Sequence, residues 1–204
     1  LHYDTIETVV ILLVIFSGVV WNFGMIVMAI DHLRAELAVL TYRDELTGVG
    51  NRRLLQERLV AAEERLRHTG LPFTLMMVDL DNFKSINDEH GHAAGDACLR
   101  QVADIAAGAL RPADLVARPG GDEFCILLAD LDGSRASAIA SELVATFRER
   151  PVPWGGGGIP LTLSIGVAEA SAAHPRTGTE LLELADRALY AVKRDGRDGY
   201  ALAA

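Results

Sequence analysis

The sequence predicts an α+β domain in which helices pack on a mixed β-sheet, preceded by one transmembrane helix and a helical stalk. Three observations support this prediction. Half of the 204 residues are apolar, which is enough for one medium domain and an additional segment. A run of 22 residues near the start, residues 9–30, carries no charge. After residue 50, helical and strand-like patterns follow in the order αβααββαβα, which is typical of a mixed sheet covered by helices.

The charge-free run, "VVILLVIFSGVVWNFGMIVMAI", has the length of a transmembrane helix. At about 1.5 Å per residue it spans about 33 Å, close to the hydrocarbon thickness of a bilayer. A buried core helix seldom stays apolar on all sides for so long. A signal peptide would need a basic start and a small-residue cleavage site. We therefore expect a membrane span in residues 1–30, at the end of a longer membrane or sensory region.

The charges on either side of the run predict its orientation. Asp4 and Glu7 precede it without any Lys or Arg, whereas basic residues follow it: His32, Arg34, Arg43, Arg52 and Arg53. The positive-inside rule then places the chain in the cell or inner membrane, with everything after the run in the cytoplasm.

Composition also limits the chemistry of the soluble part. Cys98 and Cys125 stand in apolar surroundings without other ligands at metal-binding spacing, so we expect small core residues in a reducing compartment. The net charge of −9 at pH 7 argues against a nucleic-acid partner. A phosphate-bearing ligand would need a metal and a few local cations.

Residues 31–47 are predicted to form a helical signalling stalk. Alternating spacings of four and three, typical of a coiled-coil seam, connect five apolar residues: Ile26, Ile30, Leu33, Leu37 and Leu40. A solvated helix that packs on its own domain is the alternative. We favour a parallel dimer because the pattern continues directly from the apolar run. Gly48 and Gly50 should break this helix, so the domain is expected to cover 48–204.

Within the domain, a helix is expected over about 51–69, capped by Asn51, and a strand at "FTLMMVDL". Two helical stretches should follow over about 82–110, and then a hairpin of "DLVA" and "FCILLAD". A helix over about 134–149 precedes the "WGGGG" loop, the strand "IPLTLSIGVAEA" and a last helix over about 178–194.

Two acidic clusters stand at predicted strand ends. Asp79 and Asp81 follow one apolar run and share a face if the strand continues. Asp122 and Glu123 follow two glycines at the hairpin turn. If the hairpin lies beside the first strand, the carboxylates converge, and hard oxygen ligands beside an accessible backbone suit Mg²⁺ and a nucleoside triphosphate. On spacing alone, solvated carboxylates are an equally good interpretation.

Five motifs in order resemble the GGDEF family of diguanylate cyclases over residues 43–200: "RDELTGVGNRR", "VDLDNFKSINDEHGHAAGD", "RPGGDEF", "LSIGVAEA" and "ADRALYAVKRDGR". The resemblance implies a mixed, mainly antiparallel sheet surrounded by helices, as in nucleotidyl cyclases. It also implies that two GTP molecules are condensed into cyclic di-GMP with release of pyrophosphate, through attack of a ribose 3′-hydroxyl on an α-phosphate. The catalytic domain would act as a homodimer, because one domain holds one GTP and two must face each other.

The resemblance assigns roles to the acidic clusters. Asp79, Asp122 and the Leu80 carbonyl would bind Mg²⁺, or Mn²⁺ in its place. Glu123 would support the metal or deprotonate the attacking hydroxyl. Asn87 and Asp96 would read guanine, because an Asp accepts from its N1 and N2 donors. Helix capping is the alternative for these two residues.

Cations and amides would bind the phosphates. The corresponding residues are Lys84, Lys193 and Arg197, with the amides of Asn82 and Phe83 and the glycines Gly120 and Gly121. A motif with Asp44, Asn51 and Arg52 would anchor the stalk to the domain. Pro119 stands where the family commonly has an aromatic residue and Val49 where it has a leucine. Since proline fixes φ and lacks an N–H, the turn is expected to be stiffer or slightly displaced.

Arg111 and Asp114 resemble the inhibitory site at which family members bind cyclic di-GMP. Their alternative interpretation is a solvated turn with an ion pair of little energetic value. Arg135 and Arg148 are candidates for a further arginine that would complete the site. Two other functions are considered: a catalytically silent receptor for GTP or cyclic di-GMP, and a mononucleotide cyclase. The intact acidic signature argues against the first, and the guanine readers argue against the second.

Overall fold

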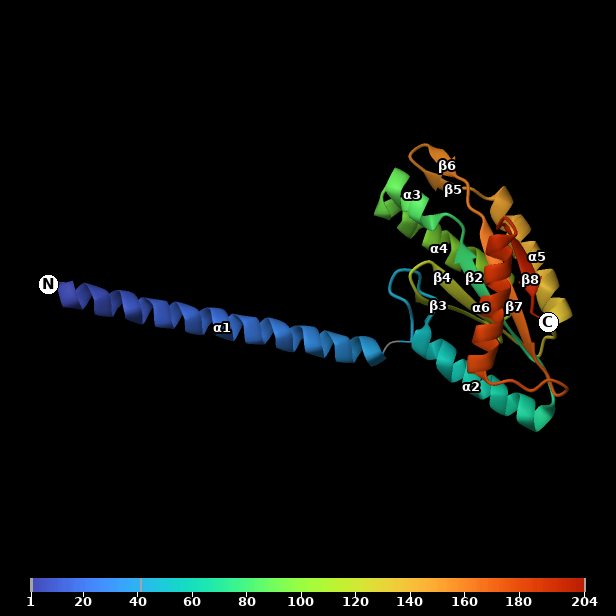
Figure 1. The fold of residues 1–204 in the computed structure, drawn as a ribbon, viewed down its shortest axis with the longest axis horizontal. Helices are drawn as coiled ribbons and strands as arrows, with labels where there is room; N and C mark the ends of the chain where they lie inside the picture. Colours follow the sequence, from blue (N-terminus) through green and yellow to red (C-terminus); the bar gives the residue numbers. More distant parts are fainter. Residues whose placement is uncertain (1, 41, 204) are drawn as a thin grey trace. The chain divides into compact units, whose positions relative to one another are not determined.

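The computed structural model describes residues 2–40 and 42–203, with side chains at 7–30 and 42–203. The chain divides into two units, Leu1–Thr41 and Tyr42–Ala204. Figure 1 shows the helix of the first unit and the mixed αβ arrangement of the second.

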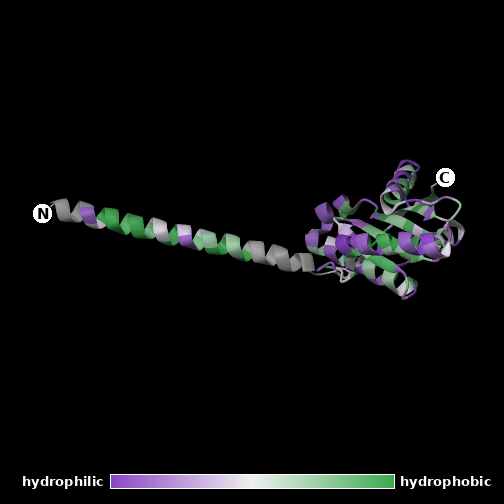
Figure 2. Ribbon diagram, turned by 90° about the horizontal axis from the view of Figure 1, so that it is seen from below, coloured by the Kyte–Doolittle hydropathy of each residue, from purple (hydrophilic) through white to green (hydrophobic). Residues whose placement is uncertain are grey.

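The first unit is one helix, α1 (His2–Leu40). The helical stalk predicted over residues 31–47 is therefore wrong at its C-terminal end, because residues 42–47 form no helix. Within it, Glu7–Ile30 is long and apolar enough to cross a membrane, and Figure 2 shows this stretch mostly in the colour of apolar residues. A signal sequence near the N-terminus would pass the same test of length and composition, so the span stays a prediction. Ile26 and Ile30 are exposed. The other residues of the predicted seam, Leu33, Leu37 and Leu40, lie outside the described side chains.

The second unit contains a six-stranded mixed sheet in the order β1-β3-β4-β2-β7-β8. Central strand β2 runs antiparallel to β4 and β7, and β3 runs antiparallel to β4, whereas the two edge strands pair in parallel. The mainly antiparallel sheet is therefore confirmed. The strands are β1 (Gly50–Asn51), β2 (Phe73–Leu80), β3 (Leu115–Gly120), β4 (Glu123–Ala129), β7 (Leu163–Ala170) and β8 (Gly199–Leu202).

Helices cover both faces of the sheet. One face packs on α4 (His92–Ala109) and α5 (Gly133–Glu149), and the other on α2 (Arg52–Thr69) and α6 (Gly178–Arg194). Strand β2 supplies both cores by alternation: Met76 and Val78 join the α4/α5 core, while Leu75 and Met77 lie on the α2/α6 side. Burial on both faces explains why β2 has an uninterrupted apolar sequence.

The predicted helix ends agree with the structure because each has a local signal. The Asn51 side chain accepts from the Leu54 N–H at the start of α2, and Gly70 closes this helix at φ 72°. Thr177 and Glu180 form a reciprocal capping box on α6. The short helix α3 (Phe83–His90) and α4 are separated at Gly91. Cys98 and Cys125 are free and buried, as predicted.

Three features differ from the expected order. A second small sheet, β5 (Val152–Trp154) with β6 (Gly157–Ile159), surrounds the glycine loop. Gly155 and Gly156 form its tip, as predicted, with φ of 56° and 80°. The strand expected from residue 159 starts only at Leu163, and Pro160 lacks the N–H that a ladder needs. The short edge strands β1 and β8 were missed because two to four residues are too few to show an alternation of apolar and polar side chains.

Candidate active site

The two acidic clusters meet at one end of the sheet. Asp79 of β2 lies directly opposite Glu123 of β4 in the antiparallel register. Opposed residues of this kind have Cβ atoms about 4.5–5.5 Å apart. Asp122 stands in the turn just before Glu123, and its charge acts on Asp79. The expectation that the hairpin brings the carboxylates together is thus confirmed.

A lysine from α6 reaches the same point. Lys193 Nζ lies 2.8 Å from Asp79 Oδ2, and the two side chains are 33% and 11% exposed. Burial raises the pKa of Asp79, Lys193 lowers it in part, and the charges of Asp122 and Asp81 raise it further. A cation beside Asp79 therefore compensates carboxylates that burial and mutual repulsion disfavour.

The donor set suits a divalent ion that shares its coordination with a substrate. Among the side chains that the structure describes, at 7–30 and 42–203, no three His, Cys, Asp or Glu residues form a ready-made metal cage. Mg²⁺ commonly takes only one or two carboxylates and completes its shell with phosphates and water. Asp79 already holds an ammonium group in the position of a cation, with Asp122 beside it and Leu80 ending the strand. The residues therefore fit Mg²⁺ bound together with a triphosphate.

The glycine turn is held by an arginine. Arg118 donates from Nε and Nη2 to the Gly121 carbonyl at 2.9 and 2.6 Å, and Gly121 has φ of 61°. The register between β3 and β4 shifts by one residue between Ala117 and Gly120. Pro119 lies in this bulge, where a missing N–H breaks no ladder bond. The bulge accommodates the unusual proline.

The two predicted guanine readers lie on neighbouring helices, Asn87 on α3 and Asp96 on α4. Neither caps a helix, because the cap positions belong to Asn82 and Gly91. The capping interpretation is therefore wrong. A Cβ at Gly95 would overlap Asn87 Oδ1, so the Asn87 amide lies against the backbone next to Asp96. Because Gly95 has no side chain, the Asn87 amide can occupy this position.

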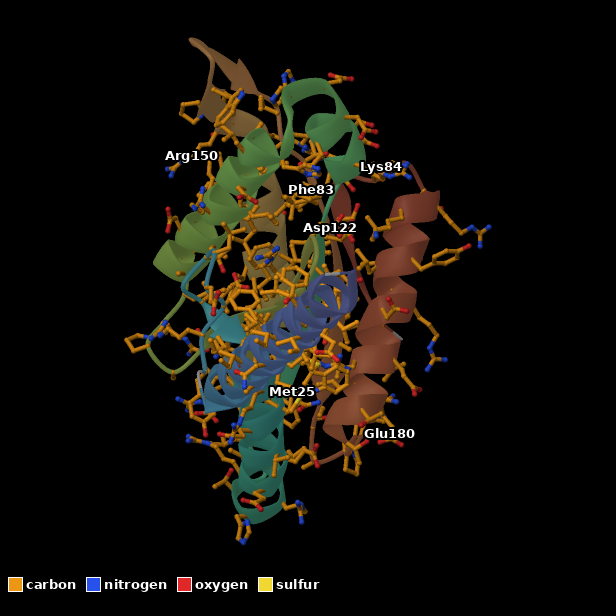
Figure 3. The ribbon with its side chains drawn as sticks, turned by 90° about the vertical axis from the view of Figure 1, so that its left-hand side faces the viewer. Met25, Phe83, Lys84, Asp122, Arg150 and Glu180 are labelled. Atoms are coloured by element: carbon orange, nitrogen blue, oxygen red, sulfur yellow. The ribbon has the colours of Figure 1, made fainter. Side chains whose placement is uncertain are left out.

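The predicted phosphate-binding groups come from two segments. Asn82 has φ of 56° just before α3, and Lys84 lies exposed in the first turn of that helix. Arg197 follows α6, also exposed, with φ of 65°. Within the described part of the chain, neither Lys84 nor Arg197 uses its side chain in a hydrogen bond or ion pair. Figure 3 shows Phe83, Lys84 and Asp122 in one region, whereas Glu180 lies at the opposite end of α6.

Asp81 has a different role from Asp79. Strand β2 ends at Leu80, so the strand does not continue through the second carboxylate. Asp81 is only 4% exposed, and its carboxylate accepts three hydrogen bonds, from Thr162 Oγ1, Ser164 Oγ and the Asp198 N–H. The signal in the sequence was a pair of hydroxyl residues in "LTLS", two apart at the start of β7, which the search for acidic groups did not use.

The comparison with known families decides how this arrangement is classified. The model of the GGDEF family, described as "Diguanylate cyclase, GGDEF domain", matches residues 41–199.

The chain belongs to the GGDEF family.

Curated relatives of this GGDEF chain include named diguanylate cyclases. Diguanylate cyclase TpbB of Pseudomonas aeruginosa is 39% identical over 170 residues, which are 83% of this chain and 39% of that protein. The probable diguanylate cyclase DgcT of Escherichia coli is 35% identical over 187 residues, 88% of this chain and 40% of its own length. The chain thus spans less than half of these curated relatives.

Solved structures of GGDEF proteins share the fold. The crystal structure of the GGDEF domain of TpbB matches with a TM-score of 0.74 and 39% identity, covering 78% of this chain and 98% of that one. A structure of the coiled coil and GGDEF domain of DgcB from Caulobacter crescentus, in complex with c-di-GMP, matches with a TM-score of 0.75 and 28% identity, covering 89% and 97%.

In this GGDEF domain the Arg111–Asp114 turn is more than a solvated ion pair. The Asp114 side chain is 1% exposed and accepts from the Arg111 Nε, Nη2 and backbone N–H, and from the Ala129 N–H. The solvated-turn interpretation is therefore wrong. Asp114 holds the turn to β4, whereas the Arg111 side chain is 52% exposed.

One arginine whose ion pair lies beside this turn was missed. Arg148 binds Asp198, and the Arg135 backbone N–H donates to Asp132 at the start of α5. Arg65 of α2 instead pairs with Asp130 at 2.6 Å, next to Ala129, whose carbonyl accepts from Arg111 Nη2. Residue 65 gave no signal in the sequence, since only the pairing of β2 with β4 brings it near residue 130.

Proposed function

We propose that this protein is a diguanylate cyclase that condenses two GTP molecules into cyclic di-GMP and releases pyrophosphate. The observation that carries the proposal is the register of Asp79 against Glu123, with Lys193 on Asp79 and Asp122 beside it. Carboxylates and a cation at one strand end meet the electrostatic demands of phosphoryl transfer. Relatives named diguanylate cyclases, at 35–39% identity, support the same activity.

Each group of residues has a task in the proposed reaction. Asn87 and Asp96 bind the guanine edge. Lys84, Lys193 and Arg197, with the amides of Asn82 and Phe83, hold the triphosphate in line. Mg²⁺ or Mn²⁺, held by Asp79, Asp122 and the Leu80 carbonyl, would supply positive charge for the phosphates. Glu123, exposed at the turn, accepts the proton of the attacking 3′-hydroxyl. Gly120 and Gly121 leave the backbone open to the nucleotide.

The reaction needs two domains. Each domain presents one set of guanine and phosphate groups, so the 3′-hydroxyl must come from a GTP on a second copy. The proposed homodimer is held by the last part of α1, residues 31–40, which raises the effective concentration of the two half-sites. Residues 9–30 would anchor the dimer in the cell membrane, with the catalytic domain on the cytoplasmic side.

Regulation by product is part of the proposal. The Arg111 side chain is 52% exposed, and its Nη1 can donate to a guanine or a phosphate of cyclic di-GMP, while Nε and Nη2 bind Asp114 and the Ala129 carbonyl. Arg65, paired with Asp130 next to Ala129, replaces Arg135 and Arg148 as the second arginine of this site. Asp114 is saturated by four hydrogen bonds, so a guanine that binds to it must first displace Arg111.

One assay tests the function. The protein is incubated with GTP and Mg²⁺, and the nucleotide products are identified by mass spectrometry. Cyclic di-GMP and pyrophosphate are expected. Cyclic GMP would indicate a mononucleotide cyclase. Binding of GTP or cyclic di-GMP without turnover would indicate a silent receptor.

A further inference from the structure

Unfavourable backbone conformations gather at the proposed triphosphate site. Four non-glycine residues of the described chain have positive φ, and three of them flank this site: Asn82 at 56°, Arg197 at 65° and Asp198 at 51°. L-residues avoid this region, and such conformations persist only where the surroundings fix them. Both segments, the entry to α3 and the turn after α6, contain residues that the proposed reaction uses on the phosphates.

Asp81 connects the two segments. It directly precedes Asn82, and its Oδ2 accepts from the backbone N–H of Asp198 at 3.1 Å. The same oxygen accepts from Thr162 Oγ1 at 2.8 Å, and Oδ1 accepts from Ser164 Oγ at 2.7 Å. The Asp81 N–H donates to the Thr162 carbonyl. Asp81 is thus fixed to β7 and, from there, holds the turn that carries Arg197.

Arg148 holds the same turn from the other side. Its Nε lies 2.7 Å from Asp198 Oδ2, and its Nη2 lies 2.8 Å from the Asp198 carbonyl. Arg148 comes from the last turn of α5 and is 53% exposed. An exposed ion pair of this kind contributes little to stability. Its two-point contact instead restricts the conformation of Asp198.

The turn is not optimised for stability alone. Asp198 Oδ1 is buried and finds no hydrogen-bond partner among the described residues. An unsatisfied buried oxygen and two consecutive left-handed residues both oppose folding. Local conflicts of this type are expected where a chain holds a functional geometry.

We propose that Asp81, together with Arg148, is a positioning residue for the triphosphate. It fixes the 196–198 turn against the start of α3, so that Arg197 and the amides of Asn82 and Phe83 bind the same phosphates. The inference rests on the proposed use of GTP. The ion pair of Asp79 in β2 with Lys193 in α6 joins the two elements that precede these segments, and the bond of the Asp198 N–H to Asp81 joins the segments themselves.

The test separates positioning from stability by comparing matched variants. Asp81→Ala removes the acceptor of the Asp198 N–H, whereas Ser164→Ala removes a donor of the same cluster and leaves that bond. Asp81→Asn keeps an oxygen for Asp198 and Thr162 and can donate to Ser164 Oγ. Arg148→Ala releases Asp198 from outside the site. Arg150→Ala removes the same charge two residues away, and it leaves the backbone bonds of Arg150 with Gln101 and Phe147 in place.

Steady-state synthesis of cyclic di-GMP gives kcat and KM for GTP, and urea unfolding gives stability. We expect Asp81→Ala and Arg148→Ala to raise KM about tenfold and about fivefold, with kcat within about threefold, because phosphate contacts bind ground state and transition state alike. Asp81→Asn should restore most of the affinity. Ser164→Ala and Arg150→Ala should leave KM within about twofold, although Ser164→Ala lowers stability. In the double variant Asp81→Ala/Arg148→Ala, the change in log KM should be smaller than the sum of the two single changes, because Asp81 and Arg148 hold the same turn.

Two outcomes would overturn the inference: an unchanged KM in Arg148→Ala, or equal changes of KM in Ser164→Ala and Asp81→Ala. If Asp81→Ala does not fold, Arg148→Ala and Asp81→Asn still decide the question. Failure of the proposed function is seen separately, since wild-type protein would then form no cyclic di-GMP from GTP.

Discussion

Arg118 forms an ion pair with Asp44, at 3.0 Å between Nη1 and Oδ1, while its other nitrogens bind the Gly121 carbonyl. One guanidinium therefore joins the point where the chain enters the domain to the glycine turn of the proposed active site. The pair is largely buried, with side chains 12% and 20% exposed. Any rearrangement at residue 44 has a direct path to the turn that carries Asp122.

The pair predicts a pH-dependent stability. Burial alone would raise the pKa of Asp44, but hydrogen bonds from Thr47 and Arg118 outweigh it and lower the pKa below 3.8. A lowered carboxylate pKa stabilises the fold above the unfolded-state value, and this contribution is lost as pH falls through the folded-state value. Asp44→Asn should therefore be less stable than wild type at pH 7, and the difference should shrink below about pH 4.

Urea unfolding between pH 7 and pH 3 measures this difference. Asp104→Asn, an exposed residue on α4, is the matched control and should show no comparable gap. If the difference in unfolding free energy between wild type and Asp44→Asn is the same at every pH, ionisation of Asp44 does not contribute to stability.

Asp122→Asn should abolish synthesis and leave the fold intact. The change removes one negative charge beside Asp79 without changing volume, and loss of such a group costs about 100-fold or more in rate. Product formation from GTP and Mg²⁺ is measured by chromatography, and folding by circular dichroism. Retained activity would contradict the assignment of Asp122 to the metal. An altered spectrum would show instead that the turn needs this carboxylate to fold.

Gly95→Ala should weaken recognition of guanine. The new Cβ would overlap Asn87 Oδ1, so the Asn87 amide would have to leave its position. We expect KM for GTP to rise about tenfold, because a site built to bind polar edges loses affinity when one partner is displaced. Gly108→Ala on the same helix is the control, since nothing lies within 4 Å of its added carbon. Equal KM values in the two variants would remove Gly95 and Asn87 from the guanine site.

Deleting residues 1–41 should make synthesis depend on protein concentration. The deletion keeps Tyr42, whose carbonyl accepts from the Asn51 N–H, so the first strand pairing is preserved. Without the helical segment the half-sites meet only by diffusion, and activity per mole should fall on dilution. Fusion to a strong coiled coil should restore it. Activity per mole that stays constant over a wide dilution series would exclude a reaction between two domains.

The sequence predicted the parts of the fold that have local signals. Asn51, Gly70 and Thr177 mark helix ends with their own backbone bonds, and the apolar run before Asp79 identifies the central strand. The roles of Asp81 and Arg65 could not be predicted. Their partners stand 117 and 65 positions away, and such contacts exist only after β2, β4 and β7 have paired. The glycine motif was visible in the sequence, but the arginine that holds it needed the register of β3.

Arg111→Ala should relieve inhibition by cyclic di-GMP. The Arg111 side chain is half exposed, and its Nη1 donates no hydrogen bond to the described residues. Ordering it on a ligand costs little conformational entropy, because Asp114 and the Ala129 carbonyl already hold its Nε and Nη2. Hydrogen bonds to a charged group are worth about 1.5–3 kcal/mol, so its loss should raise the inhibitory product concentration about tenfold or more. The initial rate at low product should change little, because the turn lies at the start of β3 and Gly120 of the proposed active site at its end. Progress curves with and without added cyclic di-GMP measure both quantities.

Arg65, and not Asp114, is the second residue at which product inhibition can be tested. Asp114→Ala would leave the Ala129 N–H and the Arg111 guanidinium without their acceptor, so it should destabilise the β3–β4 hairpin and lower all activities together. Arg65→Ala loses only an ion pair between partly exposed groups, which costs little stability. It should nevertheless weaken product inhibition if the guanidinium beside Asp130 contributes to the same site. Unchanged progress curves in both Arg111→Ala and Arg65→Ala, with cyclic di-GMP added, would show that this turn serves only the fold.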